Sequence, residues 1–262
     1  MRYILFILLI IQVVVAPTLS AQNAETDADK KALEGIIVER YYVADAADCA
    51  DTTGGMLAKG SITYRIYVDL KPDYTLQVVY GDKNHALKIQ TTTTFYNNSL
   101  AHAANGYNVH PARINENNSA LDSWLSVGAA SRDHAGILLA DDKDGSVIKK
   151  KALEKADGLA HGNLALFKPF NLDLAFFNES HGDSLFTTDN GGWAAFSGSK
   201  SGTKGPTADN RILIAQLTTN GKLSFKLNLQ VGTPTGGTIR FVADNPSDNE
   251  VQFTELSYPF VK

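Results

Sequence analysis

Three side chains that could bind a metal ion, Glu179, His181 and Asp183, occur at every second position of one short segment. On a strand this spacing would project all three from one face, as the ligands of a metal site could be arranged. Gly182 lies among them and is typical of a turn. We favour a polar loop over a metal site, and we assign no metal ligand here.

A second candidate is the acidic segment that contains Asp142, Asp144 and Gly145, which is similar to half of a calcium-binding loop. Ala140 stands where the first ligand would be expected. We therefore predict an ordinary acidic turn, with calcium binding as the alternative, and we predict no cofactor.

Nucleophilic catalysis has weak support. The pairs Ser197/Lys200 and Ser201/Lys204 have the serine-x-x-lysine spacing of some acyl-transfer enzymes, but they lie in a glycine- and serine-rich segment without the partner motifs. Cys49 is the only cysteine, so no intramolecular disulfide can form, and its acidic neighbours favour a structural role. We predict no catalytic residue, although carboxylates distant in the sequence could converge as in a glycoside hydrolase.

Aromatic side chains outside the main apolar stripes could stack on a sugar ring or on a partner protein. Trp193 follows two glycines within the glycine- and serine-rich residues 189–210, so we expect a loop in which its indole is partly exposed. For Trp124 we favour burial in the core. The predicted ligand-binding residues are Trp193, Tyr96 and Tyr67.

The elements that must position these side chains are strands. Residues 61–95 contain three runs in which apolar side chains recur at every second position, the period of a half-buried strand. Pro72 and Asp73 favour a turn after the first run, and residues 81–84 favour another after the second. The segment therefore predicts a meander of three neighbouring antiparallel strands.

Further segments alternate in the same way or form short apolar runs bounded by turn residues. The predicted additional strands are residues 36–43, 120–130, 137–139, 164–177, 211–217, 223–231, 238–242 and 251–256. Asn220-Gly221 predicts a hairpin between two of them, because both turn positions of such a hairpin need a positive φ. The predicted long loops are residues 44–59 and 97–118, and one short helix is predicted at residues 148–159. The fold class is all-β: an antiparallel two-sheet β-sandwich with long loops and at most one short helix.

The first 21 residues have the features of a secretory signal peptide: a basic residue, a twelve-residue apolar run and a small residue, Ala21, at the expected cleavage point. The run is shorter than the roughly 20 residues of a membrane span, and Pro17 ends it. We predict a secreted product of residues 22–262, extracellular or periplasmic, in one β-sandwich domain with no membrane span after cleavage.

Net charge argues against a nucleic-acid partner. The chain has 24 basic and 28 acidic residues, and loss of Arg2 with the signal peptide leaves 23 against 28, a charge of −5. Phosphate binding uses clustered Lys and Arg, and the one basic cluster, Lys149-Lys150-Lys151, is flanked by acidic residues.

Several phrases are similar to an uncharacterised family of exported proteins that is common in Bacteroidetes. These phrases are IIVERYYVADAAD, GSITYRIYVDL, TTTTFYNN, LDSWLSVGAA and PTADNRILIAQLTTNGKLSFKLNLQVGTPTGG. The resemblance implies a module of larger, type IX-secreted surface proteins, and it supplies no activity that could be assigned to residues of this chain. Because the sequence contains no catalytic constellation, we expect a non-catalytic surface, matrix or adhesion module that binds glycan or protein at the cell surface, with a carbohydrate-active hydrolase as the alternative.

Overall fold

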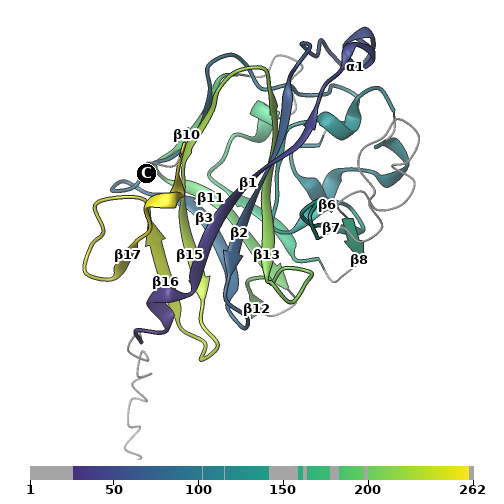
Figure 1. The fold of residues 1–262 in the computed structure, drawn as a ribbon. Coiled ribbons are helices and arrows are strands. Elements are labelled where there is room, and N and C mark those ends of the chain that lie inside the picture. The colour runs from purple at the N-terminus through teal and green to yellow at the C-terminus, as the bar shows by residue number, and fades with distance from the viewer. Residues whose placement is uncertain are drawn as a thin grey trace, which may run out of the picture.

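The computed structural model describes residues 26–259, except residues 102, 115, 142–158, 162–163, 178–182 and 198–199. Strands dominate this part of the chain (Figure 1), and its one α-helix, α1 (Ala46–Ala50), is five residues long. The predicted all-β class is confirmed. Six short 3-10 helices accompany the strands: Asp29–Lys31, Gly106–Asn108, Pro111–Arg113, Ser119–Leu121, Leu174–Phe177 and Thr254–Leu256. None of the helices among the described residues combines the length and apolar character needed to cross a bilayer.

The first layer is a four-stranded antiparallel sheet. Its strands, in spatial order, are β1 (Leu33–Val43), β2 (Ile62–Leu70), β13 (Arg211–Thr219) and β5 (Trp124–Leu125). The central pair joins segments far apart in the sequence, with Val68 opposite Ile212.

The second layer consists of two sheets that continue each other. One has the order β10 (Leu185–Thr188), β4 (Leu87–Thr91), β14 (Leu223–Lys226) and β18 (Ser257–Tyr258). The other has the order β12 (Lys200–Ser201), β11 (Gly191–Ser197), β3 (Thr75–Gly81), β15 (Asn228–Gly232), β16 (Thr238–Val242) and β17 (Glu250–Gln252), with β9 (Leu166–Phe170) also paired to β11.

The registers show how these two sheets join. Lys226 on β14 pairs with Lys88 on β4, and Asn228 on β15 pairs with Tyr80 on β3. β14 and β15 are separated only by Leu227, whereas their partners β4 and β3 are separated by residues 82–86. β10 and β11 follow each other in the same way on the far side of β4 and β3. Three interrupted strands therefore run through both sheets, and residues 82–86 form an excursion at the interruption.

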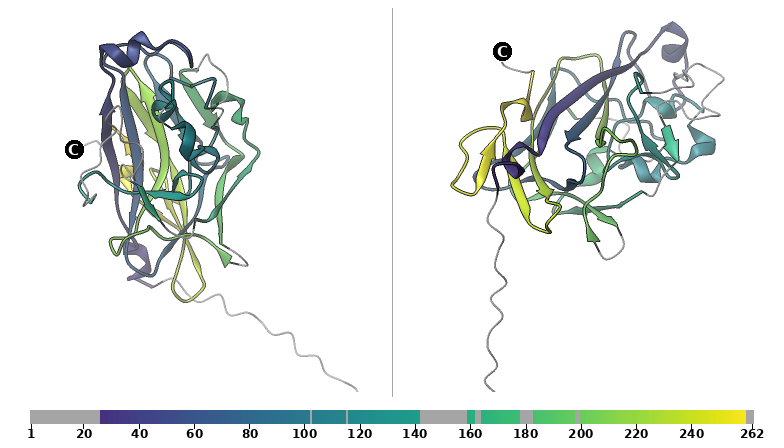
Figure 2. Two further views of the ribbon diagram at one scale, coloured as in Figure 1. Left: turned by 90° about the vertical axis from the view of Figure 1, so that its right-hand side faces the viewer. Right: turned by 60° about the horizontal axis from the view of Figure 1, so that its bottom comes forward.

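The main core lies between the layers. It contains Ile66 and Ile214 from the first layer and Val79, Trp193 and Leu229 from the second, all at most 1% exposed. Burial of such side chains is the main stabilising contribution in a sandwich of this kind. Figure 2 gives two further views of the layers.

A third group of residues covers the outer face of the first sheet. Tyr67 and Leu213 point away from the main core and pack with Val109, Ile114 and Trp124 from the segment that precedes and includes β5. A small sheet follows in this region, formed by β6 (Ala129–Ser131), β7 (His134–Gly136) and β8 (Leu159–His161).

The prediction that residues 61–70 form a half-buried strand is wrong, because β2 is buried on both faces.

Several predicted connections are wrong. The predicted meander does not form, because β2 lies in the first layer whereas β3 and β4 lie end to end in the second. Asn220-Gly221 does not close a hairpin, since β13 pairs with β2 and β5 but β14 pairs with β4 and β18. In both cases the turn carries the chain from one layer to the other, so that each strand packs its apolar face against the opposite sheet.

Other segments differ in element type. Residues 97–118 contain buried side chains and 3-10 turns rather than a surface loop, and residues 137–139 form no strand. The alternation near the end of residues 164–177 belongs to a 3-10 helix, Leu174–Phe177. α1 lies within a predicted loop, where Asp45 caps its first turn. The helix predicted at residues 148–159 falls outside the described residues except for Leu159, which begins β8.

Candidate functional site

Trp193 is buried, so the prediction that its indole is partly exposed is wrong. It lies on β11 with 0% exposed surface, and its indole N–H donates a hydrogen bond to the Ser126 carbonyl at 2.9 Å. The preceding glycines mark close packing of strands instead of a loop, because a Cβ on Gly192 would collide with the backbone of Val79 and Tyr80 on β3.

The two predicted binding tyrosines are buried as well. Tyr67 has 0% exposed surface, and its hydroxyl donates to the Ile137 carbonyl at 2.8 Å. The Tyr96 hydroxyl accepts a hydrogen bond from the Asn98 side chain at 3.0 Å, and its ring packs with Leu57 and Leu121. Neither ring offers a face to a sugar. The expected core position of Trp124, by contrast, is confirmed.

The predicted polar motifs fall largely outside the described residues. Glu179, His181, Asp142 and Asp144 are not described, and Asp183 is the one acidic residue of the two motifs that can be placed. It lies beside a surface cleft of about 430 Å³.

This cleft is built where β9 ends and β10 begins. Its described lining residues are Asn171, Leu172, Asp173, Ala175, Phe176, Asp183, Leu185, Phe186, Thr187 and Thr188. The Asp173 carboxylate accepts a hydrogen bond from the Ala175 amide at 2.9 Å, which fixes the start of the 3-10 helix Leu174–Phe177. Phe176 packs edge-on against Phe95 and Phe186, with ring centroids 6.0 and 5.3 Å apart, so the apolar side of the cleft rests on the main core.

The chemistry of the lining is mixed. Asp173, Asp183 and Asn171 supply carboxylate and amide groups, whereas Leu185 supplies an apolar side chain that is 40% exposed. Phe170, which directly precedes the lining, is 42% exposed. A concave site with a few polar groups and an apolar wall can hold a small molecule that has hydroxyl groups on an otherwise apolar frame.

Two charged side chains of the first sheet have their partners elsewhere: those of Arg65 are on neighbouring strands of that sheet, and that of Glu39 is in the segment after β7. Arg65 lies 3.6 Å from the centre of the Tyr41 ring and donates to the Gln216 side chain at 3.0 Å. Glu39 accepts the Leu139 amide at 2.7 Å, and burial raises the pKa of its carboxyl group. These side chains lie between two packed layers, away from the cleft, so their contribution is structural.

Asp122 is an acidic residue with no exposed surface. Its carboxylate accepts hydrogen bonds from the Asn98 and Ser123 amides at 2.7 and 3.0 Å. Burial nevertheless raises its pKa well above the ordinary value, because desolvation disfavours the charged form more than these bonds favour it. This acid lies just before β5 and does not line the cleft.

Within the described ranges, one group of residues could hold a metal ion. It consists of Asp82, His85 and Glu250, whose ligand atoms all lie within 4.8 Å of one another. The sequence analysis missed this group, because residues 81–84 predicted only a turn and Glu250 lies far away in the chain. It also missed Asp173, which lay in a predicted strand.

No known family model, curated protein or solved structure matches the chain. The resemblance to exported Bacteroidetes proteins is therefore untested and stays a prediction.

Proposed function

We propose that this protein is a non-catalytic, exported binding module that recognises glycan through the cleft at the ends of β9 and β10. The observation that supports this proposal is the cleft itself: about 430 Å³, lined by carboxylate, amide and hydroxyl groups together with apolar side chains such as Leu185. Small-molecule sites commonly have volumes of about 300–1,000 Å³ and combine apolar walls with a few fixed polar groups.

The lining of the cleft suits a glycan better than it suits the flat surface of a partner protein. Sugar hydroxyls pair with oxygen and nitrogen side chains such as Asp183 and Asn171, and the C–H face of a sugar ring packs against apolar groups such as Leu185. The burial of Trp193, Tyr67 and Tyr96 removes the aromatic platform expected from the sequence. Recognition at the cleft therefore depends on polar pairing, with affinity concentrated in few contacts.

The test is a glycan array followed by calorimetric titration of the best-bound sugar, with the protein from Gln22 onward. Asn171→Ala and Asp183→Asn should each weaken binding at least tenfold, since each removes a hydrogen-bonding or charged group from the lining. Phe196→Ala is the matched control: Phe196 is 42% exposed on β11 but lies outside the cleft. Unchanged affinity in both cleft variants, or binding lost only in the Phe196 variant, would contradict the proposal.

The Phe196→Ala variant also tests whether the protein binds a partner protein instead of a glycan. Phe196 and Leu166 are opposite each other on β11 and β9, and both are exposed, so a partner protein would contact this apolar pair. Loss of binding in Phe196→Ala with the cleft variants intact would assign recognition to this strand pair.

One observation favours a second function, glycoside hydrolysis. Asp173 and Asp183 both line the cleft, and glycosidases use two carboxyl groups about 5–10 Å apart across the scissile bond. A hydrolase would release reducing sugar, and Asp173→Asn and Asp183→Asn would each abolish that release while binding persisted. Absence of product from every bound glycan would leave the binding module as the function.

We also propose that residues 1–21 direct export and are removed, so that the domain acts outside the cytoplasm. The apolar run and Ala21 support this proposal.

A further inference from the structure

His85 lies in the excursion between β3 and β4 and is 2% exposed. Its backbone amide donates to the Asp82 carboxylate at 2.9 Å, and its carbonyl accepts from the Asp82 amide at 3.0 Å and from the Asn228 side chain at 2.8 Å. The same Asn228 side chain holds the Tyr80 carbonyl at 3.0 Å. The loop and the sheet beneath it thus fix the position of the imidazole.

A single contact determines which ring nitrogen carries the proton. His85 Nε2 lies 3.0 Å from the Asn245 carbonyl oxygen, which can only accept, so Nε2 donates its hydrogen. In the neutral ring Nδ1 then has a lone pair and no hydrogen. This atom is buried and has no hydrogen-bond partner among the described residues.

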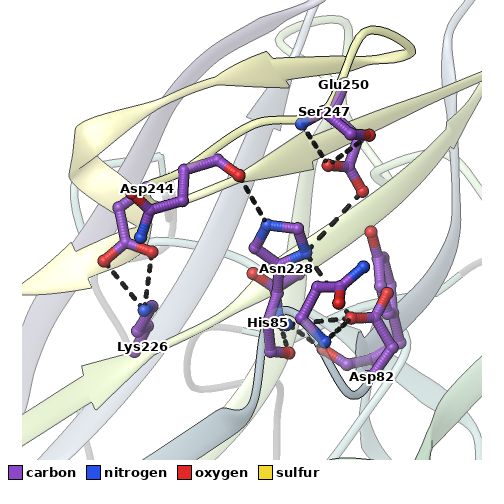
Figure 3. Close-up of polar contacts among 10 residues, drawn as sticks. Asp82, His85, Lys226, Asn228, Asp244, Ser247 and Glu250 are labelled. Atoms are coloured by element: carbon purple, nitrogen blue, oxygen red, sulfur yellow. Dashed lines mark hydrogen bonds and ion pairs between the residues drawn. The ribbon is translucent and has the colours of Figure 1, made fainter.

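The lone pair faces two carboxylates (Figure 3). Nδ1 lies 3.5 Å from Asp82 Oδ1 and 3.7 Å from Glu250 Oε1. Both distances exceed those of a good hydrogen bond. The Asp82 oxygen also accepts the backbone amides of Asn84 and His85, both at 2.9 Å. A lone pair on Nδ1 that faces two carboxylate oxygens is unfavourable unless a proton or a metal ion lies between them.

The spacing suits a cation bound to all three atoms. Zinc binds imidazole nitrogen and carboxylate oxygen at about 2.0–2.2 Å, and tetrahedral geometry then places two ligands about 3.4 Å apart. The two distances from Nδ1 are within a few tenths of an ångström of that value. We propose that Asp82, His85 and Glu250 form a binding site for a divalent transition-metal ion of the zinc type.

Hydrogen bonds from neighbouring residues orient two of the proposed metal ligands, Glu250 and His85. Glu250 Oε2 accepts hydrogen bonds from the Ser247 amide and hydroxyl, both at 2.8 Å, which leaves Oε1 directed at His85. The contact from Nε2 to the Asn245 carbonyl is the kind of outer contact that orients a metal-binding histidine. Two carboxylates and a neutral imidazole carry a charge of −2, which a divalent ion neutralises.

Ligand type narrows the class of ion. Calcium and magnesium prefer oxygen ligands alone, whereas imidazole nitrogen favours zinc and its first-row neighbours. Two more buried atoms on the strands below, the Tyr80 hydroxyl and Asn228 Oδ1, also lack a hydrogen-bond partner in the described part of the chain. Such unsatisfied groups point to a bound water or ion in their vicinity.

The site would join two distant parts of the chain. β17 has only three residues and pairs along one edge with β16, in parallel. A metal shared by Glu250 and the excursion at residues 82–86 would fasten this strand to the middle of the second layer. The expected role is structural, independent of the cleft and of the proposed glycan recognition.

The experiment uses the tag-free protein from Gln22 onward, stripped with a chelator. Zinc titration by calorimetry should show one strong site per chain, calcium should compete poorly, and zinc should raise the melting temperature. Glu250→Gln and Asp82→Asn should each weaken zinc binding at least tenfold, with little change in the melting temperature of the chelated protein. Asp248→Asn, which alters an exposed carboxylate in the same loop, is the matched control and should bind as the wild type does.

His85→Gln is a second test, although its burial makes misfolding a risk; the two carboxylate variants keep the result interpretable in that case. Zinc binding that survives in all three variants would assign the ion to another site and overturn the proposal. Absence of any binding to the wild type, or equal affinity for calcium and zinc, would overturn it too.

Discussion

The burial of Trp193 makes a quantitative prediction about stability. Trp193→Ala removes a side chain with no exposed surface. A buried aromatic covers about 200 Å², which at about 25 cal/mol per Å² corresponds to about 5 kcal/mol. Core truncations of this type cost about 3–5 kcal/mol after partial relaxation. The Ser126 carbonyl also loses its donor, at a cost of about 1–3 kcal/mol if water does not replace it.

We therefore expect Trp193→Ala to lower the free energy of unfolding by about 4 kcal/mol or more, and the melting temperature by about 8–16 °C. Trp193→Phe keeps one six-membered ring but loses the five-membered part of the indole together with its N–H, so it should cost less than Trp193→Ala but still destabilise the fold.

Urea unfolding, followed by far-UV circular dichroism, measures these differences. Phe196→Ala is the matched control on the same strand, because that side chain is 42% exposed and should cost less than about 1.5 kcal/mol. A loss below about 1 kcal/mol for Trp193→Ala would refute the argument, since no fully buried indole could be removed so cheaply.

Three further predictions concern other parts of the chain. Asp45→Ala removes the capping box of α1, in which the Asp45 carboxylate accepts the Ala47 and Asp48 amides, and should lower the free energy of unfolding by about 1 kcal/mol in urea titrations; an unchanged value would show that α1 does not depend on its cap. Burial raises the folded-state pKa of Asp122 above its unfolded-state value, so this group lowers the free energy of unfolding as pH rises from the unfolded-state pKa to the folded-state pKa. Asp122→Asn should therefore reduce the dependence of the free energy of unfolding on pH, measured by unfolding titrations from acidic to neutral pH. The same pH dependence in the variant as in the wild type would be inconsistent with a buried, perturbed carboxyl group. Mass spectrometry of the protein from its native host should find an amino terminus at Gln22, and retention of Met1 would contradict export.

The strands themselves could be predicted from alternation, but their partners could not. Residues 62–70 and 211–217 have clear strand patterns and lie in β2 and β13. Nothing in either pattern indicates that they pair with each other, because pairing depends on the packing of the whole sandwich. Sequence neighbours were assumed to pair, and this assumption produced the incorrect meander.

Glycine caused two of the other errors. Gly191 and Gly192 predicted a loop around Trp193, and Gly221 predicted a turn with positive φ. At Gly221 the φ angle is not positive; a Cβ there would instead crowd the hydroxyls of Thr91 and Thr93. Both uses of glycine, freedom in a turn and close approach of strands, look identical in a sequence.

The candidate sites were even less accessible to prediction. The metal cluster joins Asp82 and His85 to a glutamate 165 positions later (residue 250 against residue 85), and only the fold brings them together. The cleft depends on where β9 ends, and the alternation of the following residues had predicted a longer strand.

The pairing of β2 with β13 also has a consequence for how the chain folds. β2 ends at Leu70 and β13 begins at Arg211, so about 140 residues must be synthesised between them, which takes about 7–28 s at about 5–20 residues per second. Throughout that interval the hairpin of β1 and β2 has an unpaired edge that can recruit other chains. A nascent chain of this protein therefore cannot complete its first sheet from its own amino-terminal half. We expect fragments that end before Arg211 to aggregate, and the full chain to fold late and as one cooperative unit.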